Sequence, residues 1–205
     1  MIKALIVRDV RRGLTGAAWL PMAFFLLVAA LMPFAIGPDA KLLSRIAAGA
    51  LWIAALTAAL LPVERLIEPD RGDGVLDQLF LHGMAEESIA FAKIAAHWMA
   101  FGPLLLVAAI PASALLAMNG PSLARTEAAL AIGTPGLASL AVAIAAVTAG
   151  LPRAGSLAGL LLLPLAVPLL IFGAANAYLL EGAISLLLTA GAPFVAGAAI
   201  RAART

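Results

Sequence analysis

Residues 154–180 read AGSLAGLLLLPLAVPLLIFGAANAYLL and contain no charged side chain. An α-helix needs roughly 20 apolar residues to cross the ~30 Å hydrocarbon core of a bilayer, so this stretch is long enough to span a membrane. The chain has five further charge-free stretches of comparable length, at 13–38, 46–63, 94–124, 128–152 and 182–200. The sequence therefore predicts six membrane-spanning helices, which we place at 19–36, 46–63, 94–118, 128–150, 155–178 and 183–200.

The composition agrees with a membrane protein. The chain has 205 residues, of which 64% are apolar and 12% are charged, whereas an average soluble domain is ~45–50% apolar and ~25% charged. A chain of this size has too little interior to hide so much apolar surface from water, which argues against a soluble enzyme. The charge-free stretches also lack the period-two alternation of a membrane β-barrel. We therefore expect an all-α membrane protein with a single transmembrane domain over residues 1–205.

The sequence contains no recognisable catalytic or metal-binding motif. Cysteine is absent, and the patterns G-x-x-x-x-G-K-[ST], G-x-S-x-G and H-E-x-x-H do not occur. No charged residue is expected near the middle of a span, where ion-driven carriers usually keep one, and Glu181 is expected in a short outer loop. The net charge of +2 gives no reason to expect nucleic acid as a partner. The sequence thus predicts a protein that is not an enzyme, with no bound cofactor and no metal site.

The distribution of basic residues predicts the orientation of the chain. Six spans place both termini on one side, and that side carries ten of the 13 Lys and Arg residues, Arg204 among them. Basic residues are enriched in the cytoplasmic loops of membrane proteins. We therefore expect both termini in the cytoplasm.

A polar segment, residues 64–93, separates the second and third predicted spans. Residues 64–87 contain seven of the 11 acidic residues against two arginines, a net charge of −5. Asp73 is placed to cap a short helix and Gly83 to end it. The apolar face of that helix would consist of Val75, Leu76, Leu79 and Phe80. Such a helix is too short to be stable alone, so we expect it to bind a partner protein; the alternative is a solvated loop.

Residues 1–12 form a second short element before the first span. Apolar residues recur every four positions from Ile2 to Val10, and most of its arginines lie off that face. This pattern is typical of a basic amphipathic helix at the membrane interface. The alternative is a simple basic flank of the first span.

Aromatic residues and one histidine lie near the ends of predicted spans. The three tryptophans are expected in the aromatic belts at the membrane interfaces; they are Trp19, Trp52 and Trp98. His97 lies beside Trp98, one helical turn after Lys93. A lone histidine in this position is more often structural than a ligand.

Several sequence blocks carry a resemblance to a known family. They are PFAIGP at 33–38, LWIAAL at 51–56, ERL at 64–66, DGVLDQL at 73–79, AKIAAHW at 92–98, GTP at 133–135 and LPLAVPLLIF at 163–172. Six spans with short cytoplasmic elements resemble a type-2 ABC exporter permease. In this order and spacing, the blocks resemble the B subunit of the haem exporter of cytochrome c maturation over nearly the whole chain.

The resemblance implies a fold, a location and a set of partners. We expect a type-2 ABC exporter permease-like fold with short cytoplasmic coupling helices, in the bacterial inner membrane. The complex would contain two copies of this chain, two copies of an ATPase subunit that binds ATP, the C and D subunits of cytochrome c maturation, the haem chaperone E and membrane lipid. Haem would be the substrate.

The resemblance also implies the residues that act. Contacts with the ATPase are expected at Glu64, Arg65, Asp73, Gly74, Leu76, Asp77, Leu79 and Phe80. Haem contacts are conceivable at His97, Trp98 and Trp52. Two alternatives stay open: a scaffold subunit of the same complex that moves no substrate, and an ABC permease for a different substrate.

Overall fold

The fold was analysed in a computed structural model that describes residues 1–15 and 19–203. All regular secondary structure in these ranges is helical. Six of the helices are long and apolar enough to cross a membrane, as the sequence predicts. They are α2 (Trp19–Ile36), α3 (Ala40–Leu60), α6 (Glu86–Leu115), α7 (Gly120–Thr148), α8 (Ala154–Ala174) and α9 (Tyr178–Ala202).

Four of these helices begin at least five residues earlier than the charge pattern predicts. We expected starts at 46, 94, 128 and 183, but α3, α6, α7 and α9 begin at Ala40, Glu86, Gly120 and Tyr178. A charged side chain limits the lipid-embedded part of a helix, yet the helix itself continues into the aqueous layer. Caps determine two of the starts: Asp39 accepts from the backbone N–H groups of residues 41 and 42, and Asn119 accepts from that of Ser122.

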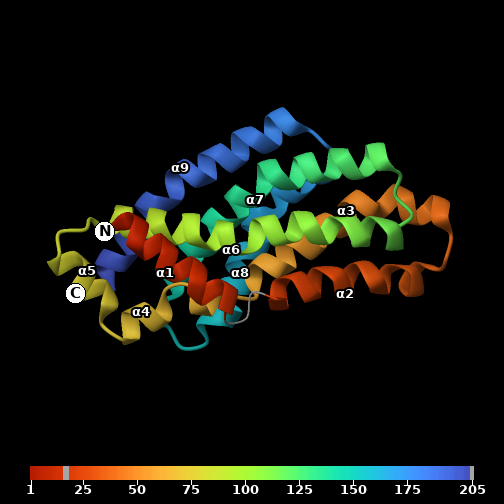
Figure 1. Cartoon of the computed structure of the whole chain (residues 1–205). Coiled ribbons are helices and arrows are strands. Elements are labelled where there is room, and N and C mark those ends of the chain that lie inside the picture. The colour runs from red at the N-terminus through yellow and green to blue at the C-terminus, as the bar shows by residue number, and fades with distance from the viewer. Residues whose placement is uncertain (16–18, 204–205) are drawn as a thin grey trace.

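Both chain ends lie at one end of the bundle. Figure 1 shows the N and C labels beside the short helices α4 (Glu68–Gly72) and α5 (Val75–Leu81), whereas the α2–α3 and α6–α7 connections lie at the opposite end. The expected common side of the termini is therefore confirmed as an end of the bundle. Arg204, which we counted in the charge argument, lies outside the described residues.

The helix α7 forms the centre of the bundle. Within its most apolar window 78% of the residues are buried, against 17% in α2 and 28% in α8. It packs against α6, α8 and α9, and its small residues permit close approach. Pro135 lacks a backbone donor, and the N–H of the next residue, Gly136, donates to Oγ of Ser185 on α9 at 3.0 Å.

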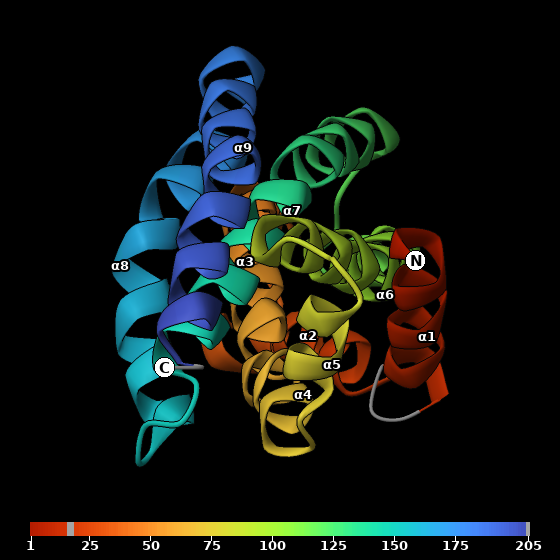
Figure 2. The ribbon, with the colours of Figure 1, turned by 90° about the vertical axis from the view of Figure 1, so that its left-hand side faces the viewer.

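The N-terminal element is helical, as predicted. Helix α1 (Ile2–Thr15) extends three residues beyond the expected end and packs against α6, with Leu5 buried between them. Figure 2 shows α1 at the outer side of α6, next to the end that carries α4 and α5. This contact places the basic face of α1 within reach of the polar segment that follows α3.

Candidate coupling segment and its surroundings

The polar segment folds into three short helices rather than one. They are η1 (Val63–Arg65), α4 and α5. The expected cap at Asp73 is wrong, because Gly74 is the N-cap of α5 and no side chain caps this helix. Gly74 has φ +68, a left-handed conformation that glycine adopts without strain, so the backbone turn itself starts the helix.

The predicted end of the helix at Gly83 is confirmed. Gly83 has φ +80 and donates its N–H to the carbonyl of Phe80 at 2.8 Å, while Met84 donates to that of Leu79 at 3.1 Å. This pair of hydrogen bonds is a Schellman motif, which satisfies carbonyls at a helix end. The segment then turns back into α6.

The expected apolar face of α5 divides into an inner and an outer part. Leu76 is buried and Leu79 packs against the core of the bundle. Phe80 and Leu81 are 43% and 81% exposed. The two inner residues therefore hold the helix on the bundle, and the outer pair offers apolar surface to the outside. Leu81 was not among the expected contacts, because helical spacing alone could not say which side is already covered.

Part of the acidic charge of the segment is compensated by basic residues of α1 and α6. Asp70 is 1% exposed and accepts from Lys93 Nζ at 2.6 Å, from Arg12 at 3.0 Å and from Arg8. Asp9 also lies 3.3 Å from the Lys93 ammonium. The isolated loop of net charge −5 is thus tied to α1 and α6, because a buried carboxylate requires positive partners.

Three further acidic residues are paired with other parts of the chain. Glu68 bonds to Arg71 at 2.8 Å and accepts from the backbone N–H of Gly150, between α7 and α8, at 2.7 Å. Arg201 near the end of α9 contacts Glu87 at 2.9 Å and Glu86 at 3.4 Å. The coupling segment, defined here as residues 63–82, is therefore fixed to α1 and α6 through Asp70 and to the α7–α8 turn through Glu68.

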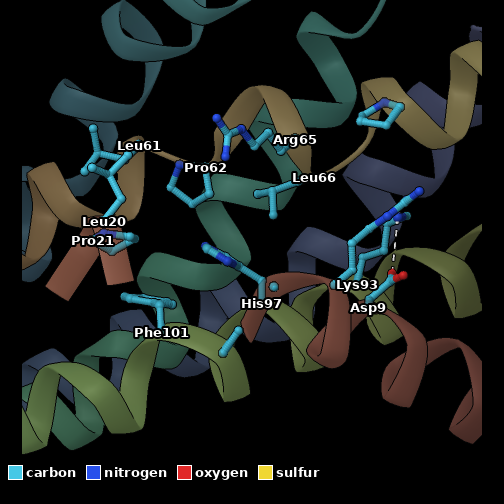
Figure 3. Close-up of a pocket in the computed structure, with 14 residues that line it drawn as sticks. Asp9, Leu20, Pro21, Leu61, Pro62, Arg65, Leu66, Lys93, His97 and Phe101 are labelled. Carbon is cyan, nitrogen blue, oxygen red and sulfur yellow. Dashed lines mark hydrogen bonds and ion pairs between the residues drawn. The ribbon is translucent and has the colours of Figure 1, made fainter. Parts of the chain in front are cut away.

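Glu64 and Arg65 point to different neighbours. The Glu64 carboxylate lies against the first turn of α8, where a Cβ on Gly155 would overlap it. Arg65 lines a pocket of about 360 Å³ between the ends of α1, α2 and α3 and the first half of α6. Figure 3 shows Arg65 above this pocket, with His97 and Phe101 on its opposite wall. The pocket is analysed separately below.

The structure distinguishes the three conceivable haem contacts. His97 lines the pocket, but its Nε2 is buried without a hydrogen-bond partner among the described residues, and its ring stacks on Phe101 at 4.8 Å between centroids. Trp98 donates from Nε1 to the hydroxyl of Thr134 at 3.2 Å. Trp52 is fully buried. Only His97 therefore borders a space that a ligand could enter.

The expected belt position of Trp52 is wrong. This residue lies in the interior of α3, and its indole occupies the space that Cβ atoms on Gly133 and Gly173 would need. The two glycines let α7 and α8 approach the ring closely, so Trp52 is a packing residue. Trp19, by contrast, begins α2 and is 64% exposed.

Glu181 lies in the bundle and not in an outer loop. It belongs to the first turn of α9, is fully buried, and neither carboxylate oxygen has a hydrogen-bond partner among the described residues. A Cβ on Gly133 would lie 2.6 Å from its Oε1, so the carboxyl group lies beside the Trp52 ring. Glu181 is thus a buried acidic residue, although it lies in the first turn of α9 and not near the middle of a span.

The chain is similar to proteins of one family over its whole length. The family model described as CcmB protein matches residues 1–203. "Heme exporter protein B" of Paracoccus denitrificans is 42% identical over 98% of both chains, and that of Rhodobacter capsulatus is 40% identical over 98% of both. The protein of the same name from Escherichia coli K12 is 41% identical over 88% of each chain. With its six apolar helices, this chain is a multi-pass membrane protein that belongs to the CcmB protein family.

Proposed function

We propose that the chain is the permease subunit of an ABC transporter of cytochrome c maturation in the bacterial inner membrane. Relatives named heme exporter protein B match nearly the full chain. The observation that carries the proposal is the coupling segment, which lies at the end of the bundle that holds both termini and presents Phe80 and Leu81 outward. On this proposal that end faces the cytoplasm, and the chain itself hydrolyses no ATP.

The outer side of α5 is the proposed contact for a separate ATPase subunit. Phe80, Leu81 and the acidic Asp77 lie on exposed positions of this helix. Leu76 and Leu79 anchor it from the inside. On this proposal the flanks of α5 also contact the ATPase. The flanking residues lie in η1 and at the junction of α4 and α5, and they are Glu64, Arg65, Asp73 and Gly74. Two exposed apolar side chains on a short helix can insert into a groove of a partner protein.

The anchoring of the coupling segment supports transmission of motion. Asp70 connects α4 with α1 through Arg8 and Arg12, and with α6 through Lys93. Movement of the ATPase against α5 would therefore displace α1 and α6 together rather than bend a free loop. This is the proposed route by which ATP hydrolysis reshapes the membrane domain.

Co-purification with the ATPase subunit tests the docking role. Leu81→Asp adds a charge at the most exposed apolar position of α5, so we expect loss of the ATPase from the purified complex and loss of stimulated ATP turnover. Leu151→Asp, at a 49% exposed leucine in the α7–α8 turn, is the matched control and should keep both. If Leu81→Asp retains the ATPase and its turnover while the chain stays monodisperse, the docking role is wrong.

The proposed assembly contains two copies of this chain and two ATPase subunits. The C and D subunits of cytochrome c maturation and the haem chaperone E complete the set of partners. The mass and composition of the complex, solubilised in detergent and measured by native mass spectrometry, test this stoichiometry. A stable assembly with one copy of this chain would contradict it.

Haem is the proposed substrate, as the names of the relatives suggest. Contact at His97 stays a prediction, and the packing of Trp52 and Trp98 favours structural roles for these two residues. The test is the haem absorbance of the purified complex: a loss in His97→Ala, with Trp98→Phe unchanged, supports the contact. Equal absorbance in both variants contradicts it.

Two other functions make different predictions for the same preparations. A scaffold subunit would retain the ATPase and the haem-handling partners but would show no haem passage in reconstituted vesicles. A permease for another substrate would leave c-type cytochromes at normal levels after deletion of the gene. Our proposal requires that deletion of the gene abolishes the c-type cytochromes.

A further inference from the structure

The pocket beside Arg65 combines apolar walls with a basic rim. It has a volume of about 360 Å³ and is lined by Leu20 and Pro21 at the start of α2, by Leu61 and Pro62 at the end of α3, and by Phe101. Figure 3 shows these side chains around one hollow, with the charged groups of Arg65, Lys93 and Asp9 at its edge. The ends of two adjacent spans therefore place the pocket at the level of the lipid headgroups.

The charges around the pocket favour an anion. Lys93 is engaged by Asp70 and Asp9, and these charges largely balance. Arg12 uses one nitrogen on Asp70 and its side chain stays 57% exposed. Arg65 is exposed and has no ion pair among those found in the described part of the chain. Two arginines from separate elements thus border the apolar space with unused donors.

We propose that this pocket binds one anionic phospholipid. Its phosphate would accept hydrogen bonds from Arg12 and Arg65. The part of the acyl chain nearest the headgroup would pack against Phe101, Pro21 and Pro62. Arginine donors suit phosphate geometry, and basic residues at the interface attract anionic lipids. Haem is the less suitable occupant, because Nε2 of His97 is buried and its ring stacks on Phe101, so this nitrogen is not exposed to the pocket as an iron ligand.

The lipid would add a second link between three elements that the ion pairs of Asp70 already join. Its phosphate would bridge the end of α1 at Arg12 and the coupling segment at Arg65, while its chain packs on α6. The bound lipid would therefore be a structural part of the coupling segment and not one of the exchanging lipids around the bundle. This inference does not depend on the substrate or on the ATPase.

Native mass spectrometry of the purified full-length chain tests the inference with added phosphatidylglycerol. We expect one retained lipid per chain, and about fivefold weaker retention in Arg65→Gln and in Arg12→Gln, the effect of one basic residue at a membrane surface. Arg11→Gln is the matched control, because Arg11 is exposed on α1 and does not line the pocket. Inorganic phosphate alone should not protect the chain against unfolding, since the apolar part of the ligand is missing.

A second variant keeps the test decisive if the arginine variants are unstable. Ala100→Leu fills the apolar side of the pocket without a change in charge, and we expect it to reduce lipid retention as well. Equal retention in Arg65→Gln and the unaltered chain would overturn the inference, as would equal losses in Arg11→Gln and Arg65→Gln. Displacement of the lipid by added haem, with a spectral shift that depends on His97, would assign the pocket to haem instead.

Discussion

The ammonium group of Lys93, in the third membrane span, lies 2.6 Å from Oδ2 of Asp70 in the coupling segment, and both side chains are buried. Arg8 and Arg12 of α1 bind the same carboxylate. Within the described part of the chain, Asp70 is thus the one anion at which α1, α4 and α6 meet. Its position explains how a short, polar segment can be held rigidly against an apolar bundle.

Asp70→Asn should destabilise the chain more than Lys93→Met. The first variant leaves Lys93 buried with Asp9 alone, and breaking a buried ion pair costs about 3–5 kcal/mol. The second leaves Asp70 with two arginines, so we expect a smaller loss. The measurement is the unfolding of the purified protein in detergent. Asp73→Asn, at an exposed position, is the control and should change stability by less than about 0.5 kcal/mol. Equal losses in the two test variants would show that Asp70 is not the shared anion.

Gly173→Ala should destabilise the bundle because its Cβ would overlap the indole of Trp52. Overpacking of this kind costs about 1–3 kcal/mol. Trp52→Phe shortens the ring and should recover part of the loss when both changes are combined, so a double-mutant cycle should give a favourable coupling. Gly159→Ala, in the same helix with open space around its Cα, should be neutral or stabilising. Additive effects at Gly173 and Trp52 would contradict the close contact.

Glu181→Gln should raise the stability of the chain by about 1–3 kcal/mol, because a neutral amide is less costly to bury without a partner than a carboxylate charge. The carboxyl group is fully buried without a hydrogen-bond partner among the described residues, and the amide keeps its shape without its charge. The thermal midpoint in detergent measures the effect, with Glu127→Gln at the same end of the bundle as the control. A lower midpoint in Glu181→Gln than in Glu127→Gln would mean that the carboxylate makes a favourable interaction.

Cysteine labelling should place the coupling segment in the cytoplasm. The sequence contains no cysteine, so a single introduced thiol gives a clean signal. We expect a membrane-impermeant maleimide to label Ala124→Cys, which is exposed near the opposite end of the bundle, in intact spheroplasts. Leu81→Cys should react only after lysis. The reverse pattern would place the coupling segment where no ATPase could bind it.

The spans could be predicted because each depends on a continuous stretch of chain. The stretch 154–180 contains α8 and the start of α9, and the predicted first span, 19–36, has the bounds of α2. Gly83 ends α5 as predicted, since a helix stop is a local backbone property. The first residue of a helix was predicted less well where charged residues near that helix end have distant partners. Helix α6 includes Glu86 and Glu87, which pair with Arg201. It also includes Lys93, which pairs with Asp70.

The sequence by itself determined the class of the protein: six apolar runs, one polar segment between the second and third, and a family resemblance carried by blocks in fixed order. The tertiary structure decided the roles of Asp70, Trp52 and Glu181, each of which had a different expected environment. Asp70 is 62 residues from Arg8, and Trp52 meets glycines of α7 and α8. Burial and charge pairing depend on which distant segments come into contact. A local sequence pattern does not show which segments these are.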